Sequence, residues 1–414
     1  MASSISAGRA VAVDVEQTLT LLFERSLQWV LQWAHAQSYA GYSKFDTFNS
    51  PVMRVLALNN RYLRLILTAA WSRSPVNLRP LLVTARSRNP KGIALFALAY
   101  LRRYCARGDK SDLNEAVELL EWLDEHHVRG YSGKCWGYEH DWQSLHFHVP
   151  KYGPNIVVTG NVAYAFLEAY EVTKERRYLD VARSTVDFLL RDLAAPIQTP
   201  EMRNIGYVPG SRWGVLNING LAATVLIWVW QHTGESQLKE EARRLITFLV
   251  DKQTDYGAWH YAWPAKTSNV KHDNYHTGNV LDWVLDYSRR SGDERFLSNY
   301  ERGLIFYRDH LFLPNGAPKW MSDKVYPFDA HSAAQGIVTF AEAALEFDPQ
   351  YIEVARRVAQ WAIENMQAPE GYFYYQKGRF WTKKYTLMRW CDAWMAYGLS
   401  SLLLAEHKLA GGTV

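Results

Sequence analysis

The sequence predicts an all-α fold, an (α/α)6 toroid of helical hairpins with short β-hairpin loops. Amphipathic runs with a polar, often Asn- or His-bearing start recur every roughly 55–65 residues, and each is followed by a short break and a second run. Such a hairpin buries its apolar stripe only against its neighbours, so the array must extend or close. Six hairpins of this length suit a closed ring, which gathers the starts of the inner helices around one cavity. Those starts are expected near Asn89, Asn155, Asn217, Asn274, Ala330 and Trp390.

The N-terminal region, residues 1–88, precedes the regular repeats. It contains a first helix over about 15–36, the loop SYAGYSKFDTFNSP, and further helices that Pro75 and Pro80 interrupt. We expect these N-terminal helices to close the ring. No linker or composition break divides the chain, so residues 1–414 are expected to form a single domain.

Within the repeats, apolar side chains follow helical spacing. Val280, Trp283, Val284 and Tyr287 are spaced i, i+3, i+4, i+7. The second helix of each hairpin has its own start signal, a cap, a first-turn acid or an early proline. These signals are Gly108-Asp109, Thr173, Gly234-Glu235, Gly292-Asp293 and Asp348-Pro349. The aromatic, Gly-marked loops CWGYEHDW, SRWG, YGAWHYAW, NGAPKW and EGYFYYQ read as turns or short hairpin strands.

Bulk properties suggest a cytoplasmic protein. No window approaches the roughly 18 consecutive apolar residues of a membrane span, and the start MASSISAGRAVAVDVEQ lacks the apolar segment of an export signal. Cys105, Cys135 and Cys391 are odd in number and far apart, as expected of reduced thiols.

The net charge of +4 is unevenly distributed. Between Asp46 and Asp109 there is no Asp or Glu, and eleven Lys and Arg side chains fall there. We expect the segment Arg61–Arg107 to form a positive surface that meets an anionic glycan or the inner face of a membrane. Alternatively, acidic surfaces elsewhere in the fold neutralise it. No known nucleic-acid-binding module is present, so nucleic acid is not an expected partner.

Several segments, taken together and in order, resemble one prokaryotic family. They are GYSKFDTFNSP, WSRSPVNLRPLL, NPKGIALFALAYL, CWGYEHDWQS, HDNYHTGNVLD, DAHSAAQGI and MRWCDAWMAYGL. Members of that family are met in capsule and exopolysaccharide biosynthesis clusters, which implies a glycan context. Some carry an aminolevulinate dehydratase label, but that chemistry needs a Schiff-base lysine in a TIM barrel, whereas the periodicity here is helical. The pattern is also similar to (α/α)6 glycan enzymes such as unsaturated glucuronyl hydrolases, N-acylglucosamine 2-epimerases and glucuronyl C5-epimerases.

Aromatic residues are abundant, with 17 Trp and 25 Tyr, and many lie in the loops between hairpins. Flat aromatic faces stack on sugars, and their polar tips bind hydroxyls. The alternative is that each ring fills a gap between hairpins. The expected sugar contacts among them are Trp136, Tyr138, Trp142, Trp259 and Tyr275.

Carboxylates are the first candidates for catalysis. Glycoside hydrolysis needs two carboxyl groups about 5–10 Å apart. Asp141, Asp273 and Asp329 are the predicted catalytic carboxylates, Glu139 is a further candidate, and Asp392 is a predicted substrate contact. Each Asp also has a structural explanation, because Asp before a helix is a common N-cap.

Histidines and amides supply the other candidates. His276, beside Tyr275, could act as the base of a lyase or epimerase. His331, Asn161 and Asn219 are expected to contact the sugar, although such amides also tie hairpins together. Arg389 could hold a carboxylate or phosphate, or simply fix the last hairpin. No metal or other cofactor is expected, because His272 and His276 would not share a helix face and no nucleotide-binding motif occurs.

The prediction is therefore a carbohydrate-active enzyme of polysaccharide biosynthesis or processing that cleaves a glycosidic bond with paired carboxylates. Two alternatives stay open: a uronate lyase or sugar epimerase that uses Tyr and His bases, and a non-catalytic glycan-binding or scaffolding protein. The expected partner is an oligo- or polysaccharide, acidic or lipid-linked, met in the cytoplasm or at the inner membrane face.

Overall fold

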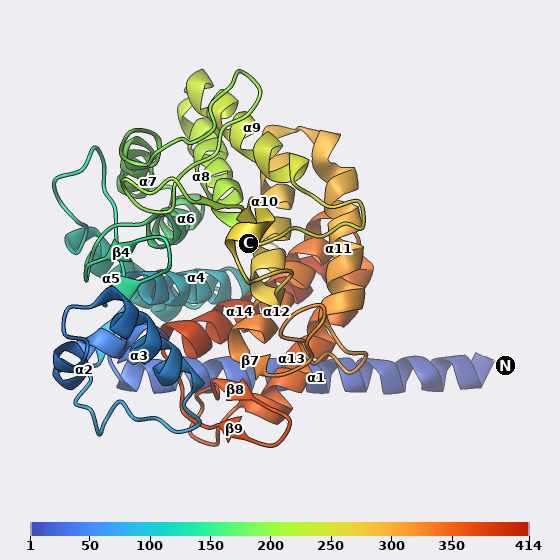
Figure 1. The fold of residues 1–414 in the computed structure, drawn as a ribbon. Helices are drawn as coiled ribbons and strands as arrows, with labels where there is room; N and C mark the ends of the chain where they lie inside the picture. The colour runs from blue at the N-terminus through green and yellow to red at the C-terminus, as the bar shows by residue number, and fades with distance from the viewer. Residues whose placement is uncertain (1, 413–414) are drawn as a thin grey trace.

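The computed structural model describes residues 2–412, with side chains from residue 17 onward, and most of the chain is helical (Figure 1). Six helices form an inner ring in which each contacts the next and the last contacts the first. They are α4 (Pro90–Arg107), α6 (Ile156–Thr173), α8 (Asn217–Thr233), α10 (Asn274–Ser291), α12 (Ala330–Glu346) and α14 (Trp394–Leu409). Because α14 packs on α4, the array closes on itself. The predicted (α/α)6 toroid is confirmed.

Six further helices pack outside the inner ring, each mainly against one inner helix. They are α5 (Lys110–Glu125), α7 (Arg176–Asp187), α9 (Ser236–Asp251), α11 (Leu297–Leu311), α13 (Ile352–Met366) and α1 (Ala2–Ala36), which packs on α14. Inner helices are covered on almost every side and are rich in small apolar residues, whereas outer helices bury one stripe. This difference separates the two layers.

The predicted helix starts are found at the expected residues. The side chains of Asn89, Asn155 and Asp329 accept hydrogen bonds from the backbone of the first helical turn, which satisfies N–H groups that would otherwise lack a partner. Gly108 and Gly234 end α4 and α8 with φ of 71° and 72°, a conformation that favours glycine. Polar starts and glycine ends therefore define the hairpins.

Short antiparallel strands join the loops at the end of the ring where the inner helices begin. The pairs are β1 (Ala40–Gly41) with β2 (Ser87–Arg88), β3 (Trp142–Gln143) with β4 (His148–Val149), and β5 (Gly214–Val215) with β6 (Ala262–Trp263); β7 (Phe328–Asp329), β8 (Gln376–Lys377) and β9 (Thr382–Lys383) form a three-stranded sheet. Single turns of 3-10 helix are η1 (Asp46–Asn49), η3 (Ala265–Thr267), η4 (Glu294–Phe296) and η5 (Pro349–Tyr351), and π-helical turns are η2 (Phe188–Asp192) and η6 (Arg389–Ala393). The predicted hairpin loops are thus present.

Two helices, α2 (Pro51–Leu56) and α3 (Arg61–Arg73), lie beside the ring over a small second core. That core contains Phe48, Met53, Ala57 and Trp71. Across residues 2–412, no helix is both long and apolar enough to span a membrane.

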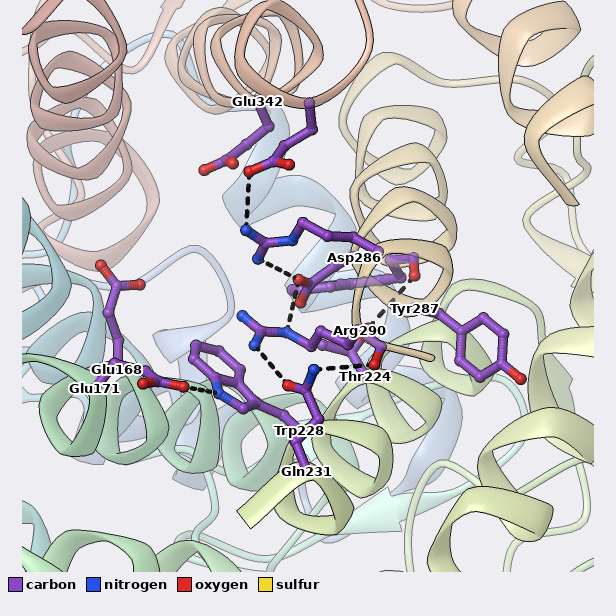
Figure 2. A network of polar contacts seen from close by, with 12 residues as sticks. Glu168, Glu171, Thr224, Trp228, Gln231, Asp286, Tyr287, Arg290 and Glu342 are labelled. Atoms are coloured by element: carbon purple, nitrogen blue, oxygen red, sulfur yellow. Dashed lines mark hydrogen bonds and ion pairs between the residues drawn. The ribbon is translucent and has the colours of Figure 1, made fainter. Parts of the chain in front are cut away.

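The opposite end of the ring, where the inner helices finish, contains paired charges. In Figure 2, Arg290 lies beside Asp286, Gln231 and Trp228; its Nε donates to Asp286 Oδ1 at 2.7 Å, and its guanidinium carbon is 3.3 Å from the Trp228 ring centre. Basic groups at helix C-termini also suit the helix dipole. These contacts neutralise and pack the C-terminal end of α10.

Candidate active site

A cavity of about 130 Å³ lies where the inner helices begin. That is several times the roughly 30 Å³ of one water. Every inner helix contributes a residue from its start: Lys91 from α4, Val157 from α6, Asn217 from α8, Tyr275 and His276 from α10, His331 from α12, and Arg389 and Trp390 from η6 before α14. Loops and one deeper amide complete the lining with Phe45, Tyr138, Trp142, Tyr207, Tyr261 and Asn279.

His276 is held by a buried carboxylate. Its Nδ1 lies 2.7 Å from Asp273 Oδ2, and the Asp273 side chain is only 4 % exposed. Asp273 occupies the N-cap position of α10, yet its carboxylate makes no capping bond. Since Nδ1 is engaged, Nε2 is the nitrogen left to exchange a proton. The rings of Tyr275 and Tyr261 pack against the imidazole, with centres 4.2 and 4.4 Å away.

His331 is a second imidazole at the cavity, sandwiched between aromatic rings. Its ring centre lies 4.5 Å from that of Tyr275 and 4.4 Å from that of Trp394. Neither ring nitrogen has a hydrogen-bond partner among residues 17–412. Burial, with help from the nearby cations Lys91 and Arg389, holds the pKa of His331 well below its ordinary value. A neutral imidazole with unpaired nitrogens can accept a proton or bind a hydroxyl.

Lys44 is a site residue that sequence reasoning missed. Its Nζ lies 3.7 Å from the ring centre of Trp390 and within 6 Å of the rings of Phe45, Tyr275 and Trp320. Burial lowers the pKa of Lys44 to about 8, although Asp329 favours its charged form. The only available signal was a lone lysine among aromatic residues in GYSKF, outside the repeats.

Six residues predicted for the site line the cavity: Tyr138, Trp142, Tyr275, His276, His331 and Arg389. Asp273 lies directly behind His276. Asn161 borders a smaller space of about 30 Å³ deeper in the ring, which Asn279 and Trp394 also line. Its amide donates to Val157 O at 2.7 Å.

Trp136, Trp259 and Asn219 do not reach the cavity. The two indoles are buried and donate to the backbone carbonyls of Leu123 and Leu249, at 2.8 and 2.9 Å. The buried Asn219 amide bonds the backbone of its own helix start and Ile205 N. These side chains fasten loops to helices, so the structure does not place them as substrate contacts.

The predicted carboxylates differ in where they lie relative to the cavity and in what they bind. Asp329 accepts from Trp390 Nε1 at 2.8 Å, Gln376 Nε2 at 2.8 Å and His331 N at 3.0 Å, so its acceptor sites face protein donors. Asp392 accepts from Phe373 N and Thr386 Oγ1, and burial raises its pKa to about 7. In this arrangement both carboxylates hold loops and helix starts together by hydrogen bonds.

Asp141 lies outside the lining. Its Oδ1 accepts from Lys151 N at 2.7 Å, and Oδ2 is 4.0 Å from Arg64. Glu139 is buried beside Asn89, whose amide donates to it, and 3.3 Å from His140 Nδ1. Burial alone would raise the pKa of Glu139, but His140 and Arg389 outweigh it and hold the pKa below its ordinary value. The lining itself contains neither Asp nor Glu.

The basic segment is divided between interior and surface. Arg79 pairs with Asp46, Arg102 with Glu168 and Glu342, and Arg103 with Asp112, while Lys91 lies at the cavity. The exposed members include Arg54, Arg61, Arg73, Arg86 and Arg107. The prediction that Arg61–Arg107 forms a positive surface is therefore wrong for the inner residues: Lys91 and Arg102 lie on the buried face of α4, and the buried Arg79 lies in a turn before it.

No protein-family model and no curated protein matches the sequence. Solved structures do match the fold. A GH76 α-mannanase from Bacteroides thetaiotaomicron has a TM-score of 0.62 at 14 % identity, covering 80 % of this chain and 90 % of that one. An unsaturated glucuronyl hydrolase specific for heparin has 0.58 at 13 %, covering 88 % and 97 %. Cellobiose 2-epimerase from Bacillus thermoamylovorans has 0.58 at 12 %, covering 76 % and 87 %. At these identities the similarity shows a shared architecture, the (α/α)6 toroid.

Proposed function

We propose that this protein is a carbohydrate-active enzyme that moves a proton on a sugar bound in the cavity, by epimerisation or elimination. The observation that carries the proposal is the lining: two histidines flank Tyr275, one of them anchored by Asp273, and no lining side chain is a carboxylate. Paired carboxylates would be needed for glycoside hydrolysis. Imidazoles are suited to abstract and return protons near neutral pH.

The walls of the cavity suit a sugar. Trp142 and Trp390 offer indole faces, and Tyr138, Tyr207 and Tyr261 add rings with polar tips. The amides of Asn217 and Asn279 can bind hydroxyls. Apolar surfaces with a few converging polar groups are typical of small-molecule sites.

The two histidines can take complementary roles. His276 Nε2 removes a proton from a ring carbon, and Asp273 stabilises the imidazolium that forms. His331, on the other side of Tyr275, is placed to handle a proton or hydroxyl at a second position. Return of a proton to the opposite face gives an epimer, whereas loss of a neighbouring substituent gives an unsaturated sugar.

Hydrolysis is the second candidate. The GH76 α-mannanase and the unsaturated glucuronyl hydrolase share the toroid, and Asp273 is a buried carboxylate one layer behind the lining. A shift of the His276 ring would bring Asp273 to the cavity.

Incubation in D₂O with acidic and neutral oligosaccharides, followed by mass spectrometry, tests the proposal. Epimerisation adds deuterium without cleavage, elimination gives an unsaturated end, and hydrolysis adds water across a bond. His276→Gln should abolish the reaction, while His126→Gln, at an exposed histidine, should not. Saturable binding with no reaction would make the protein a glycan-binding or scaffolding protein and overturn the proposal.

We also propose that the protein works on polysaccharide intermediates, the glycan context that the family resemblance implies, and that it does so in the cytoplasm in contact with the inner membrane face. The supporting observation is an unusually apolar surface over residues 51–83 and the tip of the β8–β9 hairpin, hereafter the α2–α3 surface. Its side chains are 40–89 % exposed: Val52, Val55, Leu56, Leu58, Tyr62, Ile66, Val76, Leu81, Val83, Phe380 and Trp381. Trp381 Nε1 donates to Pro75 O, which joins the hairpin tip to this surface.

The charge of this surface matches an anionic membrane. No Asp or Glu occurs between Asp46 and Asp109, and Arg54, Arg61, Arg73 and Arg86 are exposed there. Each basic side chain near an anionic surface contributes about 1 kcal/mol. Contiguous exposed apolar patches in soluble proteins commonly mark interaction sites. Co-sedimentation with anionic and neutral vesicles at low salt tests the contact, and equal, negligible binding to both would remove it.

A further inference from the structure

Two buried cations at the cavity, Lys91 and Arg389, form no direct ion pair with a carboxylate of the described residues, although the charge of Arg389 reaches the buried Glu139. Among residues 17–412, the Lys and Arg residues that are buried are Arg79, Lys91, Arg102, Arg203 and Arg389. The paired ones are Arg79 with Asp46, Arg102 with Glu168 and Arg203 with Glu241, at N–O distances of 2.9, 3.0 and 3.0 Å. Lys91 and Arg389 form no ion pair within 4.0 Å in that part of the chain. Within residues 17–412, the buried cations away from the cavity are thus paired with carboxylates, and the two at the cavity are not.

Lys91 and Arg389 are brought together by close packing of two helix starts. Lys91 is the second residue of α4, and Arg389 begins η6. A Cβ added to Gly92 would lie 3.2 Å from the Cβ of Arg389, so the glycine permits this approach. Both side chains line the cavity, with only 6 % and 3 % of their surface exposed. The Arg389 Nε has no hydrogen-bond partner within the described chain.

The surroundings add to the positive potential. All six inner helices direct their N-terminal, partially positive ends toward this cavity. Lys44 adds a third cation close by, over Trp390. Buried charges are normally paired, because desolvation without a partner is costly. Burial, and then Arg389, hold the pKa of Lys91 well below its ordinary value, as expected of a cation that lacks its counter-charge.

We infer that the sugar bound here carries an anionic group, which sits between Lys91 and Arg389. The inference rests on the proposed function and names its substrate class, an acidic sugar. A carboxylate and a phosphate share the required chemistry, since both accept charge-assisted hydrogen bonds from a guanidinium and an ammonium.

A carboxylate would also assist the proposed proton transfer. When His276 takes the proton from the carbon next to the carboxylate, the C–H bond breaks and an N–H bond forms. The electron pair moves onto the carboxylate, whose added negative charge the two cations stabilise. Protonation at the same carbon then gives the epimer, or loss of the substituent on the next carbon gives the unsaturated sugar.

Calorimetric titration of the full chain with three probes tests the inference. The probes are a uronate-containing disaccharide, its neutral counterpart, and glucose 6-phosphate, in buffers free of phosphate. The acidic disaccharide should bind tenfold to a hundredfold more tightly than the neutral one, the range expected of charge-assisted bonds. Titration in two buffers of different ionisation enthalpy should show proton uptake, because the bound anion favours the charged form of Lys91, whose pKa burial lowers.

Variants separate the site from general charge effects. Lys91→Met and Arg389→Gln should reduce the affinity for the acidic disaccharide to that of the neutral one. Lys110→Met and Arg129→Gln, at exposed positions, should leave it unchanged. Thermal unfolding checks that each variant folds. Lys91→Arg, which keeps the charge, should still bind the acidic disaccharide more tightly than the neutral one.

Each result decides a different question. Tighter binding of glucose 6-phosphate than of the uronate would support the anion site and assign it to phosphate. Equal affinity for acidic and neutral sugars, with turnover still dependent on His276, would overturn the anion site and leave the proposed function standing. Failure of any sugar to bind or react would overturn both.

Discussion

Asp273 Oδ2 lies 2.7 Å from His276 Nδ1, three residues further along α10. An Asp at an N-cap position normally accepts from the backbone of the first turn. Here the carboxylate makes no such bond and is turned toward the imidazole instead. The pair therefore fixes the orientation of His276, with its free nitrogen available at the cavity.

Asp273→Asn should lower kcat by about a hundredfold or more, because the amide cannot stabilise the imidazolium. The melting temperature should change little, since no capping bond is lost. Steady-state kinetics and thermal unfolding of the same preparation measure the two effects. Full activity with reduced stability would show that Asp273 acts only in the framework.

Asp329→Asn should have the opposite effect and mainly reduce stability. Its carboxylate accepts from Trp390 Nε1, Gln376 Nε2 and the backbone, and an amide would set an NH₂ group against one of these donors. The expected loss in the free energy of unfolding is about 1–3 kcal/mol, measured by urea titration. Unchanged stability would contradict the framework role.

His331→Phe should preserve the fold while reducing turnover. The ring would still stack between Tyr275 and Trp394, and two buried nitrogens without partners would be removed. We expect an unchanged or slightly raised melting temperature, with kcat at least tenfold lower. Wild-type kcat in this variant would exclude His331 from the reaction.

The periodicity of the chain was enough to predict the ring, because the apolar stripe of each hairpin can be buried only against the neighbouring hairpins. The periodicity was not enough to predict the direction in which a polar side chain points. Asp273 and Asp329 both precede a helix, yet Asp329 caps it through His331 N whereas Asp273 turns to His276. Lys91 was one cation among eleven in the basic segment, since linear sequence does not reveal which charges find partners in three dimensions.

Asp282 should make a contribution to stability that is lost as pH rises from about 4 to about 8. Burial raises its pKa to about 8 in the folded protein, against about 3.9 when unfolded. Between these values the native state holds the extra proton, so the free energy of unfolding decreases by up to about 1.4 kcal/mol per pH unit. Urea unfolding at pH 5 and pH 8 should show a smaller decrease for Asp282→Asn than for wild type or the exposed control Asp255→Asn.

The α2–α3 surface should lose membrane binding when acids replace its apolar side chains. Ile66→Glu and Phe380→Glu are at positions 62 % and 89 % exposed, so neither disturbs the core. Co-sedimentation with phosphatidylglycerol vesicles at low salt should drop for both, while Ile305→Glu on α11, 41 % exposed, should bind like wild type. Equal binding by all four proteins would place the contact elsewhere.

The closure of α14 on α4 has a consequence for synthesis of the protein on the ribosome. Arg389 and Trp390, which complete the cavity wall, come after the first five inner helices in the chain. The first five inner helices can emerge and pair in order, but they leave an open crescent with no enclosed site. A nascent chain therefore cannot enclose its ligand until η6 and α14 have emerged, and truncation before Arg389 would leave most of the helices and no activity.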